Sequence, residues 1–97
     1  MPWFEKNGLC DQLQRATVSI GSNIAEGCAK PSDADFVKFL DTALGSAYEV
    51  ETQMTIAHNV GCINEDIFNG MINEAQAIEK QLTALIRSIR KGESSSS

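Results

Sequence analysis

Glu79 is the residue whose type and position most suggest chemistry in this chain. It is the one charge in the middle of an apolar stripe, and Ala75, Leu82 and Ile86 share its helical face. A carboxylate enclosed by apolar side chains can be tuned for acid–base catalysis. The alternative is a buried polar layer that fixes the register of neighbouring helices, and this structural interpretation is favoured. We expect that layer to contain Gln12, Arg15, Ser46 and Glu79.

The other reactive residue types form no recognisable site. His58 is the only histidine, and a single histidine makes a poor metal site. The carboxylates include no E-x-x-H pair, which argues against a ferritin-like di-iron centre. The three cysteines are odd in number and widely spaced, with no C-x-x-C motif. A glycine-rich phosphate loop is also missing from the sequence. We therefore predict no catalytic residue, no metal and no cofactor.

The charge balance argues against a nucleic-acid partner. The 97 residues carry 8 basic and 13 acidic side chains, a net charge of −5, whereas phosphate contacts need an excess of Lys and Arg. The basic residues Lys80, Arg87, Arg90 and Lys91 are expected near a helix C-terminus from the macrodipole alone. No signal peptide or long apolar run is present, so we expect no membrane contact and a cytoplasmic location.

The apolar periodicity predicts an all-α protein, an up-down antiparallel helical bundle. Three helices are expected at about residues 9–26, 33–60 and 65–90. Ser32 and Asn64 are suitable N-caps, while Gly27 and Gly61 suit the left-handed position that closes a helix. Short connections make adjacent helices antiparallel neighbours. We predict one bundle domain, residues 1–91, and a disordered Ser-rich tail, residues 92–97.

The predicted central helix carries an unusually wide apolar arc. One stripe contains Phe36, Ala43, Val50 and Ala57, and the first and third helices can cover it. A second stripe lies roughly 100° away and has no obvious cover within the chain. We therefore predict a homo-oligomer and assign its interface to Val37, Leu44 and Tyr48.

The run from Gln12 to Gly27 reads QLQRATVSIGSNIAEG and resembles a family signature. It is similar to the pattern Q-L-x-R-A-x-x-S-I-x-x-N-I-A-E-G of bacterial four-helix-bundle proteins first noticed as products of intervening sequences in 23S rRNA genes. The resemblance covers about Glu5 to Ile89. Further matching positions follow the first run: Phe36, Phe39, Leu40, Ala43 to Ser46, Glu49, Glu51, Ala57 and Gly61. It implies structural or interfacial roles for the polar motif positions, which are Gln12, Arg15, Ser19, Asn23, Glu26, Ser46 and Glu49.

The resemblance also carries expectations about assembly. Family members known as accessory proteins of diversity-generating retroelements form pentameric barrels and bind nucleic acid and a reverse transcriptase. A pentamer is therefore implied here, although those accessory proteins are basic and this chain is acidic. Members usually have a further helix before the segment that corresponds to Glu5–Leu9. We expect either a truncated coding start or a three-helix member that recruits its fourth helix.

These observations favour a non-catalytic oligomeric binding or scaffold protein with a protein partner. The alternative is an accessory protein that associates with RNA, DNA or a reverse transcriptase. An enzyme ranks third, because it would need a ligand beside Glu79 or His58.

Overall fold

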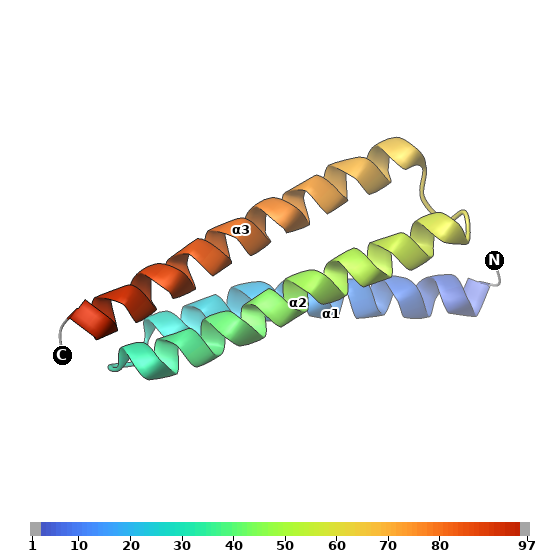
Figure 1. Cartoon of the computed structure of the whole chain (residues 1–97). Helices are drawn as coiled ribbons and strands as arrows, with labels where there is room; N and C mark the ends of the chain where they lie inside the picture. Colours follow the sequence, from blue (N-terminus) through green and yellow to red (C-terminus); the bar gives the residue numbers. More distant parts are fainter. Residues whose placement is uncertain (1–2, 96–97) are drawn as a thin grey trace.

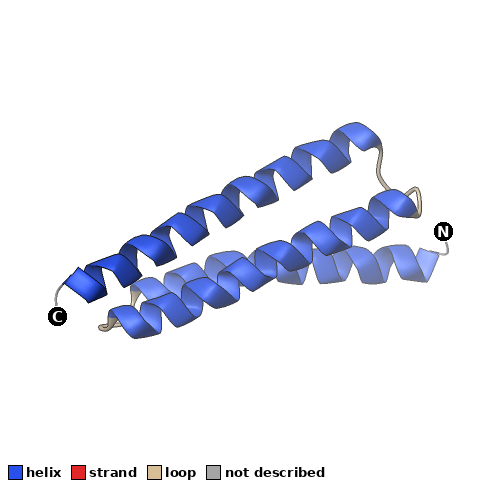
Figure 2. Ribbon diagram, in the orientation of Figure 1, coloured by secondary structure: helices blue, strands red, loops and turns tan. Residues whose placement is uncertain are grey.

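A computed structural model of the protein describes residues 3–95, with side chains placed from 11 to 92. It contains three α-helices, α1 (Trp3–Cys28), α2 (Asp33–Asn59) and α3 (Glu65–Ser95), and the described residues include no strand. The predicted all-α helical fold is confirmed (Figure 2). None of the helices, over the part of the chain that the structure describes, combines the length and apolar character needed to cross a bilayer.

Two helix ends differ from the sequence prediction. Helix α1 begins at Trp3, where a connection was expected, and α3 continues through Gly92 to Ser95. A glycine within a helix costs only about 1 kcal/mol relative to alanine, so Gly8 and Gly92 do not end these helices. Residues 96–97 of the predicted tail lie outside the described residues, and the division into domain and tail stays a prediction.

The predicted N-caps and one predicted C-terminal glycine are confirmed. The Ser32 hydroxyl accepts a hydrogen bond from the Asp35 amide at 3.2 Å, and Asn64 Oδ1 accepts one from the Ile67 amide at 2.8 Å. Gly61 has φ of +81°, so it turns the chain out of α2 in the left-handed region.

Gly27 has a different role from the predicted one. It lies inside α1, is buried, and among the described residues Gly61 alone has a positive φ. A Cβ atom at Gly27 would lie 2.8 Å from Phe36 Cδ1 and 3.0 Å from Phe39 Cβ. The missing side chain therefore lets the end of α1 approach the start of α2 closely, which the cap prediction did not foresee.

Helix α2 is the centre of the arrangement (Figure 1). Both α1 and α3 pack on it, whereas no Cα atom of α1 lies within 8 Å of a Cα atom of α3 among the described residues. Successive helices run antiparallel, and the Cα atoms span 55 Å along the long axis. Leu40 and Met54 of α2 are the largest fully buried side chains, so the core follows the middle of this helix.

Candidate functional site

A small polar network joins α1 to α2, and we call it the α1–α2 seam (Ser19, Asn23 and Ser46). The hydroxyl oxygens of Ser19 and Ser46 lie 2.8 Å apart, and Ser46 also donates to the carbonyl oxygen of Thr42 at 3.2 Å. Asn23 Nδ2 donates to the Ser19 carbonyl oxygen at 2.8 Å and to Ser19 Oγ at 3.0 Å. With Ser46 donating to Thr42, Ser19 donates to Ser46 and accepts from Asn23. The two hydroxyls, buried at Ser46 and half-buried at Ser19, are thus satisfied within the chain.

Gln12 and Arg15 lie further along the same side of α1. Together with Glu49 and Gln53 of α2 they line a surface hollow of about 330 Å³. Both are exposed, and Arg15 pairs with Asp11 within its own helix at 2.9 Å. The structure therefore places six of the seven polar motif positions along one side of α2, while Glu26 pairs with Lys30 at 3.9 Å at the end of α1. Their functional role stays a prediction.

The predicted layer of Gln12, Arg15, Ser46 and Glu79 does not form. That prediction placed all three helices side by side, whereas α1 and α3 contact different sides of α2. Ser46 bonds to Ser19 on one side, and Glu79 packs on the other. Exposed Gln12 and Arg15 therefore cannot compensate the Glu79 carboxyl group. Glu79 is nevertheless buried, with 9% of its surface exposed, as the apolar stripe indicated.

Glu79 meets a second carboxyl group, that of Glu51 on α2. Burial raises the pKa of Glu79 from 4.5 to about 7, and a side-chain hydrogen bond and charge repulsion with Glu51 contribute in the same direction. Gln76 Nε2 donates to Glu51 Oε1 at 3.2 Å, while Glu79 Oε2 is buried without a hydrogen-bond partner among the described residues. These three residues form the α2–α3 seam (Glu51, Gln76 and Glu79).

Sequence reasoning included Glu51 among the family positions but missed its contact with Glu79, although a signal for that contact existed. Glu51 follows Tyr48 by three residues and Leu44 by seven, so all three share one face of α2. Assigning that face to α3 would have placed a carboxylate opposite Glu79. The face was instead assigned to an external partner.

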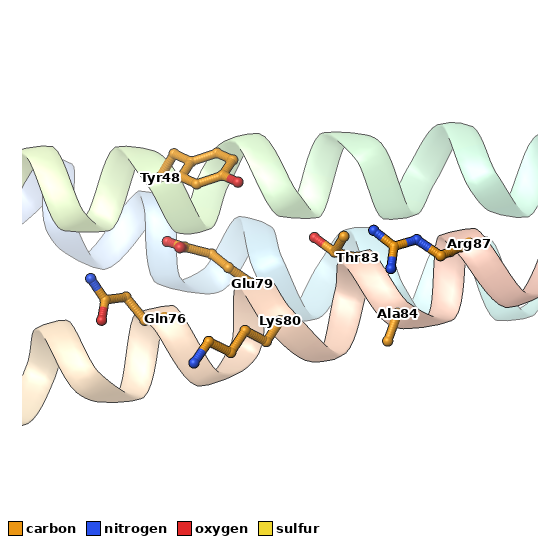
Figure 3. A pocket seen from close by; sticks show the side chains of 7 residues that line it. All are labelled: Tyr48, Gln76, Glu79, Lys80, Thr83, Ala84 and Arg87. Carbon is orange, nitrogen blue, oxygen red and sulfur yellow. The ribbon is translucent and has the colours of Figure 1, made fainter.

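A groove of about 460 Å³ lies along the α2–α3 seam (Figure 3). Tyr48 contributes from α2, and the remaining lining residues come from one side of α3: Gln76, Glu79, Lys80, Thr83, Ala84 and Arg87. An adjoining hollow of about 260 Å³ shares Thr83 and Arg87 with it, and Asp41 pairs there with Arg90 at 3.4 Å. The seam thus combines a buried carboxyl group, an aromatic ring and basic side chains in one concave surface.

The residues predicted as an external interface mostly face α3. Val37 is buried with 7% of its surface exposed, and Leu44 is partly buried against the core. Tyr48 remains half exposed at the rim of the groove. Val37 is therefore not available to another chain in this structure, because α3 lies on the side assigned to a partner. His58 stacks on Phe68 of α3, with ring centroids 4.3 Å apart.

Both seams lie in the part of the chain that is similar to known proteins. A family model described as 23S rRNA-intervening sequence protein matches residues 1–84. The chain is also similar to a crystal structure of a protein of unknown function from the S23 ribosomal protein family of Bacteroides thetaiotaomicron. That similarity has 31% identity and a TM-score of 0.79, and covers 80% of this chain and 72% of the other. A comparison with curated proteins gave no match. Both seams lie within the matched segment.

Proposed function

Because the chain belongs to the 23S rRNA-intervening sequence protein family, we propose that it is a non-catalytic helical binding or scaffold protein that works as a homo-oligomer. The similar Bacteroides protein is itself described as having unknown function, so it suggests no reaction. The α1–α2 seam is satisfied within the chain, as in a structural contact. The sequence resemblance makes five the expected number of subunits.

One observation carries the proposed assembly: an apolar edge of α3 is left open. Helix α3 contacts α2 alone, and Ile67 and Leu85 keep 49% and 41% of their surface exposed. Met71 and Ile78 lie on the same stripe and are only partly buried. Because exposed apolar stripes commonly mark protein interfaces, we assign the contact between subunits to this edge of α3. It replaces the predicted interface at Val37 and Leu44.

The molar mass in solution tests this assignment. We expect light scattering after size exclusion to give a multiple of the chain mass for the wild type. The double variant Ile67→Glu/Leu85→Glu should give a single chain, with an unchanged helical circular dichroism spectrum. Val18→Glu is the matched control, because Val18 is 66% exposed on the far side of α1. A wild-type mass equal to one chain would contradict the proposal.

A nucleic-acid-associated function is the second candidate, and the position of the basic residues favours it. Since α3 continues to Ser95, its last turn holds no basic residue, and the macrodipole does not explain Lys80 and Arg87. Filter binding of RNA and single-stranded DNA tests this function. Specific binding should fall steeply with added salt and weaken in Lys80→Gln/Arg87→Gln. Failure to bind at low salt would dismiss the candidate, which the net charge of −5 already disfavours.

A further inference from the structure

The groove along the α2–α3 seam has opposite chemistry at its two ends. Its volume of about 460 Å³ falls in the range of small-molecule sites, roughly 300–1,000 Å³. In Figure 3 the Glu79 carboxyl group lies below the Tyr48 ring near Gln76, and Arg87 lies toward the other end of the groove. The two ends therefore select different parts of one ligand.

The end near Gln76 offers hydrogen-bond acceptors. The Glu79 carboxyl group is nine-tenths buried, and its Oε2 atom has no partner among the described residues. Gln76 donates its amide to Glu51, which leaves the Gln76 carbonyl oxygen as a further acceptor. The half-exposed Tyr48 ring lies beside these groups and can contact a cation through its face. This end suits an ammonium group, which donates three hydrogen bonds.

The other end offers a guanidinium group. Arg87 points back along α3 toward Thr83, and it has no ion pair among the described residues. A guanidinium group binds a carboxylate through two parallel hydrogen bonds. In Figure 3 Lys80 points away from Arg87 and toward Gln76, so Arg87 supplies the positive charge at this end of the groove. A ligand with only positive charge would be repelled here, whereas one that also carries a carboxylate would be held.

We propose that this groove binds an ω-amino carboxylate, a zwitterion whose ammonium group donates to Glu79 and whose carboxylate pairs with Arg87. The aliphatic chain between the two charges lies beneath Tyr48 and against Ala84. This site is separate from the apolar edge of α3 that carries the proposed assembly, so the two proposals can fail independently.

Electrostatic interactions in the groove favour the binding of this ligand. The charged and titratable groups that line the groove or face Glu79 are Tyr48 and Glu51 from α2 and Lys80 and Arg87 from α3. Because the pKa of Glu79 is raised to about 7, a proton offsets the repulsion between the two carboxyl groups in the free protein at neutral pH. A bound ammonium group can take the place of that proton. Affinity should therefore increase as the pH rises from about 6 to about 8.

Titration followed by amide NMR spectra tests the site with three probes of similar length. ε-Aminocaproate should give saturable shifts at residues of the groove, while hexylamine and hexanoate should bind at least about tenfold more weakly, because each lacks one charged end. Glu79→Gln and Arg87→Gln should each lower the affinity for ε-aminocaproate about tenfold. Arg15→Gln is the matched control, since Arg15 is exposed on the other side of the molecule and should leave the affinity unchanged.

Three results would overturn the proposal. The first is the absence of saturable shifts with ε-aminocaproate. The second is equal binding of hexylamine and ε-aminocaproate, which would remove the role of Arg87. The third is unchanged affinity in Glu79→Gln when its spectrum shows an intact fold. Tyr48→Ala provides an independent variant at an exposed position. We expect it to lower the affinity for the zwitterion while the helices remain folded.

Discussion

The two seams against α2 treat buried polar groups in opposite ways. In the α1–α2 seam, Ser19, Asn23 and Ser46 satisfy one another and the neighbouring backbone. In the α2–α3 seam, two carboxyl groups face each other and Glu79 Oε2 has no partner among the described residues. A satisfied network favours one register, whereas an uncompensated carboxyl group costs stability. Gln53 Oε1, in the hollow beside Gln12 and Arg15, is also buried without a partner among the described residues, so the contrast concerns the two named seams and not the whole α1–α2 contact. It favours a structural role for the α1–α2 seam and leaves the Glu79 carboxyl group of the α2–α3 seam available for binding.

The largest expected effect comes from removing the Glu79 charge. Because the folded protein holds the Glu79 proton up to about pH 7 and the unfolded chain releases it near 4.5, folding stability falls as the pH rises between these values. The full difference corresponds to about 3 kcal/mol. We expect Glu79→Gln to match the wild type near pH 4 and to exceed its free energy of unfolding by about 3 kcal/mol near pH 8. Urea denaturation at a series of pH values measures the free energy of unfolding of the wild type and of the variant.

The control for this experiment is Glu74→Gln on the exposed side of the same helix. It removes one negative charge without removing a buried one, so its effect should stay within about 0.5 kcal/mol. If Glu79→Gln lost stability at every pH, the carboxyl group would be a net stabilising partner. The contrast between the two seams would then disappear.

The next effect tests the close approach of α1 and α2. Gly27→Ala places a methyl group 2.8 Å from Phe36 Cδ1 and 3.0 Å from Phe39 Cβ, and overpacking of this kind costs about 1–3 kcal/mol. Gly21→Ala in the same helix meets nothing within 4 Å and should stabilise by up to about 1 kcal/mol through helix propensity. Thermal and urea denaturation should therefore shift in opposite directions for the two variants. Equal shifts would show that Gly27 is not needed for packing.

These examples show what the sequence could and could not predict. The helices and their N-caps were predictable because they depend on local periodicity and on short-range bonds such as Ser32 to Asp35. Burial of Glu79 followed from its stripe. Its partner did not, because that depends on which sides of α2 the other helices occupy. For the same reason, sequence reasoning placed Gln12 and Arg15 in one layer with Glu79, which does not form. It also placed Val37 at an external interface, although Val37 is buried. A helical wheel gives the face of a residue but not the neighbour that the face meets.

The Ser19–Ser46 pair provides a smaller test of the α1–α2 seam. Each single substitution by alanine should cost about 1 kcal/mol, since it leaves a buried hydroxyl with fewer partners. The double-mutant cycle should give a coupling energy of about 0.5–1.5 kcal/mol, because the two hydroxyls bond directly. Ser22→Ala, at an exposed position of α1, is the control and should change little. A coupling energy near zero would mean that this network does not fix the register.

The smallest effect concerns the ion pair between Asp41 and Arg90, which links α2 to α3 at the outer edge of the groove. The pair is 3.4 Å long, and the two side chains are 51% and 61% exposed. Exposed pairs contribute little because water and salt screen them, so a double-mutant cycle with Asp41→Asn and Arg90→Gln should give about 0.2–0.5 kcal/mol and nearly nothing at high salt. A coupling above about 1 kcal/mol that persisted in salt would show that this pair stabilises the α2–α3 contact more than an exposed ion pair should. The contact between α2 and α3 would then contain a strong ion pair in addition to the two carboxyl groups. The expected weak coupling instead leaves the Glu79 carboxyl group without compensation from this pair, so that it is available to a ligand that brings its own cation.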